Sequence, residues 1–200
     1  MSKLSLSVLL CLASFCTHGV TLEFSPATGP GGSRIETQWI ESGFVISSDR
    51  MGSQSAGVVP GWPANGTDVL SFFKDLTGTN IVIRSTLDFS FDAISVDLAE
   101  YSFVYPVPTT VQFIGFLSAG GIVTTSFTTD GLLDGPGGQA DFETFEFPST
   151  FRSLSRIEVP SHLFAMDNLQ LIPVPEPSVA LLLIMSSLLA ILGFRYRVFE

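Results

Sequence analysis

The sequence predicts an all-β domain, an antiparallel β-sandwich, between two hydrophobic chain ends. Short apolar or alternating segments follow one another at close spacing, separated by turns rich in glycine and proline. No amphipathic helix of useful length interrupts them. The chain has 18 phenylalanines, and those of the domain lie nearly always within predicted strands, which suits a thick core between two sheets. A jelly roll is the expected sandwich topology, although the periodicity alone does not select it.

The individual strands are placed by alternation and by the turns that flank them. The segment 91–101 alternates apolar with polar or small residues, the period of a half-buried strand. Segments 110–117 and 122–128 flank a Ser-Ala-Gly-Gly turn and form the clearest hairpin. The predicted strands are 20–24, 43–47, 67–74, 80–84, 91–101, 110–117, 122–128, 142–147, 154–159 and 163–171, with polar loops at 25–33 and 52–66.

The N-terminal segment 1–19 is interpreted as a secretory signal peptide. Lys3 supplies a positive charge and is followed by an apolar stretch too short for a comfortable membrane anchor. We place the cleavage after Gly19. Both cysteines of the chain, Cys11 and Cys16, then leave with the leader. The domain, residues 20–172, must be stable without disulfides, from a packed core and with a metal ion as a further source of stability.

The charge of the chain excludes one class of partner. It carries 19 acidic against 9 basic residues, a net charge of −10 at pH 7. Such a surface repels the phosphates of nucleic acid, and no basic patch with interleaved aromatic residues offsets it. No nucleic-acid partner is therefore expected. The many carboxylates are also candidate ligands for calcium.

The C-terminal segment 173–200 differs in composition from the domain before it. Its residues 179–194 are uncharged, and as a helix they would span roughly 24 Å at about 1.5 Å per residue. Flanking residues would complete the crossing of a hydrocarbon core about 30 Å thick. A final buried helix is the alternative, but the run is apolar on every face and an all-β domain has no place for it. Arg195 and Arg197 follow the run and predict a cytoplasmic C-terminus.

The prolines before this predicted transmembrane helix define a motif. They cannot enter a helix interior, and they favour an extended backbone that a membrane-embedded enzyme could bind. The residues of the motif are Val174, Pro175, Glu176, Pro177 and Ser178. Together with the leader, the apolar span and the terminal arginines, this motif resembles the PEP-CTERM sorting signal of Gram-negative bacteria.

The resemblance implies a route and partners. An exosortase would process the tail after residues 179–194 have held the protein in the inner membrane. The protein would then pass to the cell envelope or extracellular matrix, often in bacteria that make exopolysaccharide. The resemblance covers only the end of the chain, so it implies nothing about the chemistry of the domain.

The residues for hydrolytic catalysis are scarce. After removal of the leader, His162 is the single histidine and no cysteine remains, so neither a triad nor a zinc site can be assembled convincingly. We therefore expect a non-enzymatic protein, with polysaccharide as its candidate ligand. A secreted glycan-active enzyme that uses two carboxylates is the alternative, although no pair stands out.

Calcium is the candidate ion for the domain. Glu23 lies in the first predicted strand, and Asp167 and Asn168 lie in the last, as in many jelly-roll carbohydrate-binding modules that this pattern resembles. In those modules the two strands are neighbours and share a structural calcium. Alternation in the last strand changes phase near Asp167, which predicts a bulge that could turn oxygens toward an ion. The alternative is that Asp167 and Asn168 only satisfy a bent edge strand.

Trp62 is the candidate sugar-binding residue. It stands in Pro60-Gly61-Trp62-Pro63, where proline and glycine place it in a loop. An exposed aromatic ring there could stack on a sugar. The alternative is that Trp62 closes one end of the sandwich as part of the core.

Overall fold

A computed structural model of the full chain describes residues 18–25, 33–54, 63, 65, 67–72, 80–102, 106–135 and 140–174. They belong to one compact unit, Thr17–Val174. The strands within the described part are β1 (Val20–Leu22), β2 (Ser33–Glu41), β3 (Phe44–Gln54), β4 (Val69–Phe72), β5 (Ile81–Ser85), β6 (Phe91–Glu100), β7 (Thr110–Leu117), β8 (Ile122–Thr128), β9 (Glu143–Glu146), β10 (Leu154–Val159) and β11 (Phe164–Pro173).

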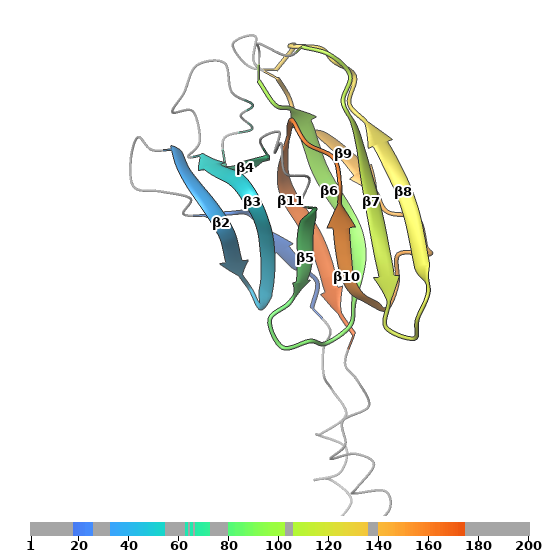
Figure 1. Cartoon of the computed structure of the whole chain (residues 1–200). Helices are drawn as coiled ribbons and strands as arrows, with labels where there is room; N and C mark the ends of the chain where they lie inside the picture. Colours follow the sequence, from blue (N-terminus) through green and yellow to red (C-terminus); the bar gives the residue numbers. More distant parts are fainter. Residues whose placement is uncertain are drawn as a thin grey trace, which may run out of the picture. The chain divides into compact units, whose positions relative to one another are not determined.

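All strand pairs are antiparallel, and the strands form one sheet in the order β8-β7-β10-β5-β3-β4-β11-β6-β9, with β1 on β11 and β2 on β3 (Figure 1). The sheet curves until its two ends meet, because the Phe127 ring of β8 stacks on the Phe145 ring of β9 with centroids 5.1 Å apart. The result is a nearly closed, barrel-like sheet. The prediction of an all-β antiparallel domain is confirmed, and so is the β7–β8 hairpin.

The two sheets expected from the sequence are joined into one because two long strands change partner. The first half of β3 pairs with β5 and its second half with β4. Likewise, β11 pairs first with β4 and then, on the same edge, with β1. The short strand β4 therefore links the two layers.

The region from β2 to β3 differs from the sequence prediction. No strand was expected at Ser33–Glu41, and β3 continues to Gln54, beyond the expected end at residue 47. Both segments are largely polar and alternate weakly, so hydrophobic periodicity does not reveal them. Their extended form comes from pairing, since β2 lies along β3 from Ser33 opposite Gln54 to Glu41 opposite Phe44.

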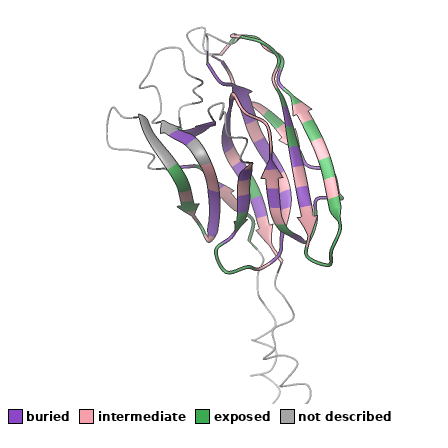
Figure 2. Ribbon diagram, viewed as in Figure 1, coloured by how far each residue is buried: buried purple, intermediate pink, exposed green. Residues whose placement is uncertain are grey.

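Buried positions recur along the strands of the domain (Figure 2), and phenylalanine is the most frequent residue of the core. Phe113 is fully buried and its ring lies 5.1 Å from Phe147 and 5.6 Å from Phe127. Edge-on and tilted contacts of this kind add to the free energy gained by burying the rings. Because none of the residues 20–172 is cysteine, disulfides contribute nothing to the stability of the domain, and this packing is its main source.

The domain begins and ends at the same place. Val20 of β1 pairs with Leu171 of β11, so the chain enters and leaves the sheet side by side. Pro173 of β11 pairs with Phe91 of β6, and Phe164 pairs with Glu100. Nine residues separate Phe91 from Glu100 along β6, roughly 30 Å at about 3.3 Å per residue. Glu100, the last residue of β6, therefore lies at the opposite end of the sheet from Val20 and Leu171, and Figure 1 shows β6 pointing away from the end of β11.

Truncating the aromatic core should be costly. Phe113→Ala removes a fully buried ring and is expected to lower the free energy of unfolding by about 3–5 kcal/mol. Ile122→Ala on the paired strand is the control, because Ile122 is 61% exposed, and it should cost no more than about 0.5 kcal/mol. Urea unfolding monitored by far-ultraviolet circular dichroism, which should be β-dominated, measures both. Similar losses in the two variants would contradict this account of the core.

Candidate functional site

The first polar cluster surrounds Asp167 on the outer face of β11. Asp167 is fully buried, although it is charged. Its Oδ2 accepts hydrogen bonds from Asn65 Nδ2 at 2.7 Å and Thr67 Oγ1 at 2.6 Å, and its Oδ1 accepts one from the backbone N–H of Asn168 at 2.7 Å. The Thr67 N–H in turn donates to Asn65 Oδ1 at 3.1 Å, so the two residues form a turn that covers the carboxylate.

The bulge predicted near Asp167 is present. The register of β11 against β6 shifts between Asp167 and Gln170, and Asn168 has a φ of 45°. This left-handed conformation, which asparagine tolerates better than most residues, directs Asn168 Nδ2 to Asp97 Oδ2 at 2.8 Å. Thr144 Oγ1 donates to the other Asp97 oxygen at 2.7 Å. The bulge therefore links β11, β6 and β9 through side chains.

Glu23 lies near this cluster but has a different environment. β1 pairs with β11, as the calcium prediction requires, and the register brings Leu22 opposite Leu169. Glu23 itself is exposed, and its N–H donates to Glu41 Oε1 at 3.1 Å. The Asp167 carboxylate already accepts three hydrogen bonds. A calcium role for Glu23, Asp167 and Asn168 stays a prediction.

The Asp167 carboxyl is a weaker acid than an ordinary aspartate, mainly because it is buried. Loss of solvation raises the pKa of Asp167, and the charge of Asp97 adds to the rise, while the donors Thr67, Asn65 and Asn168 N–H oppose it. The opposing contributions leave the pKa above its ordinary value. The hydrogen bonds thus reduce the cost of burying this carboxylate without removing it.

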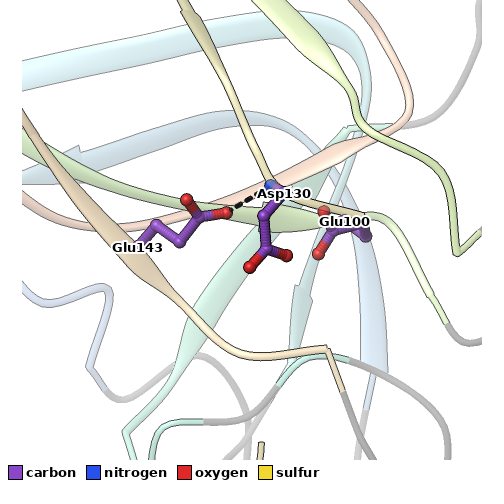
Figure 3. Close-up of side chains that lie close together, drawn as sticks. All are labelled: Glu100, Asp130 and Glu143. Carbon is purple, nitrogen blue, oxygen red and sulfur yellow. Dashed lines mark hydrogen bonds between the residues drawn. The ribbon is translucent and has the colours of Figure 1, made fainter. Parts of the chain in front are cut away.

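A second cluster, which we call the acidic triad, consists of Glu100, Asp130 and Glu143. One carboxylate oxygen from each lies within 4.8 Å of the others (Figure 3). Glu100 ends β6, Asp130 follows β8, and Glu143 begins β9. Glu100 and Glu143 face the same way because of the strand register. Leu98 of β6 pairs with Glu143, and Glu100, two residues after Leu98, lies on the same inner face of the sheet.

The loop after β8 is held in place by these carboxylates. Glu143 Oε1 accepts the N–H of Asp130 at 2.7 Å, and Glu100 Oε1 accepts the N–H of Gly131 at 2.8 Å. Gly131 has a φ of 78°, and a Cβ there would lie 2.4 Å from Pro108 Cδ, so only glycine fits. Asp130 Oδ1 accepts the N–H of Leu132 at 2.7 Å, which tightens the turn.

Two carboxylates at this end of the sheet, Glu143 and Asp141, have raised pKa values. Burial raises the pKa of Glu143, helped by the charges of Asp130, Glu100 and Asp141. Burial also raises the pKa of Asp141, together with a hydrogen bond that the protonated Asp141 carboxyl donates to Asp134 and with the charges of Asp134 and Asp130. Five acidic residues therefore concentrate negative charge at this end of the sheet.

The triad was missed by sequence reasoning, although one signal was available. Val96, Leu98 and Glu100 occupy the same phase of β6, so a carboxylate stands where alternation calls for an apolar residue. Asp130 and Glu143 lie in segments that carry no comparable signal. Only the pairing of β6 with β9 and the course of the loop after β8 bring them to Glu100.

Several predicted features lie outside the residues that the structure describes. These are the leader up to residue 17, Trp62, the motif from Pro175 to Ser178, the run 179–194, and the basic residues Arg195 and Arg197. Val174 is described, and its N–H donates to the Ser90 carbonyl at 2.8 Å just beyond β11. Among the described residues, none forms a helix with the length and apolarity needed to cross a membrane. His162 is half-buried between β10 and β11.

No protein-family model and no curated protein matches the chain. Among solved structures, the crystal structure of an agarase, AgWH50C, is distantly similar to it, with a TM-score of 0.29 and 12% sequence identity. The similarity covers 78% of this chain and 25% of the agarase chain, so this chain spans about a quarter of the length of that protein. At this level of similarity, neither a fold, a ligand nor a reaction follows from it.

Removing the Asp167 carboxylate should destabilise the domain. Asp167→Ala leaves three donors without their acceptor, which is expected to cost about 1–3 kcal/mol of unfolding free energy. Because the pKa of Asp167 is raised in the folded state, its contribution is largest at low pH and declines as the pH rises through that pKa. The difference between wild type and variant should therefore widen on acidification. Glu146→Ala, at an exposed position on β9 outside the network, is the control for urea unfolding at several pH values. A loss no greater than that of the control would contradict the network's role.

Proposed function

We propose that this chain is an exported, non-enzymatic protein of the cell envelope or extracellular matrix of a Gram-negative bacterium, sorted by an exosortase and associated with polysaccharide. The observation that carries the proposal is the joint pattern of leader, Pro175-Glu176-Pro177, apolar run 179–194 and terminal arginines. The domain is proposed to be a β-sandwich of jelly-roll type, and no nucleic-acid partner is proposed because the chain is strongly acidic.

The geometry of the domain supports attachment from one end. Val20 and Leu171 are paired, so a segment before the domain and a segment after it would join it at neighbouring points. Glu100 and the loops beside it lie roughly 30 Å away along β6. A domain held by its last strand would present that far end to its surroundings, where a matrix polymer is within reach.

A secreted glycan-active enzyme is the alternative, and one observation favours it. Burial raises the pKa of Glu143, while an oxygen of Asp130 lies within 4.8 Å of it. Retaining glycosidases use two carboxyl groups roughly 5–5.5 Å apart, one of which keeps its proton near neutral pH. We place this second because Glu100 is a third carboxylate within 4.8 Å of the pair, whereas a retaining glycosidase uses only two.

Sorting gives the first test of the proposal. In a host that has exosortase, the full chain should lose its tail and leave the inner membrane. Replacing Pro175, Glu176 and Pro177 by alanine should keep the tail attached, because the extended segment that the enzyme binds is lost. Intact-mass analysis of the exported protein measures this, with an exosortase-deletion host as the control. A mature product that keeps residues 179–200 and is indifferent to the deletion would refute exosortase sorting.

Binding without turnover is the second expectation. The exported protein should co-sediment with the exopolysaccharide of its host, and no new reducing ends should appear. If reducing ends do appear and disappear in Glu143→Gln, the two-carboxylate enzyme is correct instead. Glu146→Gln on the same strand is the matched control, because Glu146 is exposed and lies outside the triad. If the protein neither binds nor cleaves the exopolysaccharide, polysaccharide is not its ligand.

A further inference from the structure

The acidic triad contains a buried charge without a counter-charge. Glu100 is fully buried, and its Oε2 has no hydrogen-bond partner. An ionised carboxylate in that position is costly, and the two neighbouring carboxylates add repulsion. Within the described residues, no lysine or arginine forms an ion pair with the triad. The ion pairs among the described residues lie elsewhere and join Arg84 to Asp88, Arg152 to Asp92, and Arg156 to Glu158.

The arrangement of the three carboxylates satisfies the geometry of a cation site. Their closest oxygens lie within 4.8 Å of one another, so a single ion between them could contact all three (Figure 3). The backbone donors Asp130 N–H and Gly131 N–H bind Glu143 Oε1 and Glu100 Oε1, and Glu100 Oε2 has no hydrogen-bond partner. In Figure 3 one oxygen of Glu100 lies beside the Asp130 carboxylate. This buried orphan oxygen distinguishes the triad from an ordinary patch of surface acids.

We propose that Glu100, Asp130 and Glu143 bind one calcium ion. The ligands are carboxylates only, with no histidine or cysteine, which excludes the usual zinc sets and favours a hard cation. Magnesium is generally held by one or two protein carboxylates and several waters, in strict octahedral geometry. Calcium accepts more oxygens in irregular geometry, and backbone carbonyls or water would complete its coordination.

The ion would join three segments that are distant in the sequence. It would fasten the loop after β8 and the start of β9 to the end of β6, at the end of the sheet opposite the chain ends. The three ligands converge only in the folded chain, so calcium should bind the native state and stabilise it by mass action. The inference depends neither on sorting nor on polysaccharide binding.

Calcium should raise the melting temperature of the full chain, purified in detergent. At a calcium chloride concentration a hundredfold above the dissociation constant, the rise is expected to be about 5–10 °C for a domain of this size. Magnesium chloride at the same concentration should give a smaller rise. Equal melting temperatures in calcium and in chelator would overturn the proposal.

The ligand variants can be chosen so that they remove charge and little else. In Glu143→Gln and Asp130→Asn, the amide oxygen can still accept the N–H of Asp130 or of Leu132, so the loop keeps its hydrogen bonds. Both variants should lose most of the calcium-induced rise, and isothermal titration with calcium chloride should show binding weakened at least tenfold. Glu146→Gln, an equal change on the exposed face of β9, should retain the full response.

Glu100→Gln distinguishes a metal site from a merely structural cluster. Its oxygen can still accept Gly131 N–H, and its amide group can donate to Asp130 or Glu143 in place of the ion. In chelator this variant should melt higher than the wild type, and in calcium it should melt lower. A purely structural Glu100 would give a variant that is less stable in both buffers.

Two further results would decide against the triad. If Asp167→Ala abolishes the calcium response while Glu143→Gln keeps it, calcium binds at the cluster predicted from the sequence and the proposal is wrong.

The pH dependence of the calcium-induced rise is the other check. Protons should compete with calcium at Glu143, whose pKa is raised by burial and by Asp130, Glu100 and Asp141, the last of which also faces Asp134. The calcium-induced rise should therefore shrink as the pH falls toward 5, and a rise that grows on acidification would contradict it.

Discussion

The antiparallel pairing of β11 with β6 determines most of the remaining structure. β11 carries β1 and β4 on its other edge, and β6 carries β9, so these two strands connect the start, the middle and the end of the domain. The bulge in this pairing turns the Asn168 side chain toward Asp97 on the outer face. The same register sets how far Glu100 lies from the chain ends. A shift of one residue would exchange the two faces of β6.

The two faces of β6 have different surroundings. The inner face continues the phenylalanine core, which must stabilise a domain without cysteine, and it ends in the carboxylate of Glu100. On the outer face, Asp97 receives two side-chain donors from neighbouring strands. The oxygens of the outer carboxylates Asp97 and Asp167 thus accept hydrogen bonds from donors within the protein. The inner one has an oxygen without such a donor, which is the physical reason to look for an ion there.

Some elements followed directly from local patterns. The β7–β8 hairpin was predictable because two alternating strands flank a glycine turn, and Gly120 and Gly121 do adopt positive φ values of 92° and 105°. The bulge near Asp167 was predictable because alternation changes phase there. β2 was not, because its residues alternate weakly and are extended only by pairing with β3. Local sequence cannot report a pairing partner that lies elsewhere in the chain.

The sequence by itself determined the all-β class and the acidic character of the chain. It also determined the lack of cysteine in the domain and the distinct composition of both chain ends. Each of these properties depends on composition or on periods of a few residues. Only the tertiary structure decided that β4 joins the layers into one curved sheet, and that Glu100, Asp130 and Glu143 converge. Those outcomes depend on register and loop course between strands far apart in the chain. A long-range contact leaves no periodic trace at either of its partners.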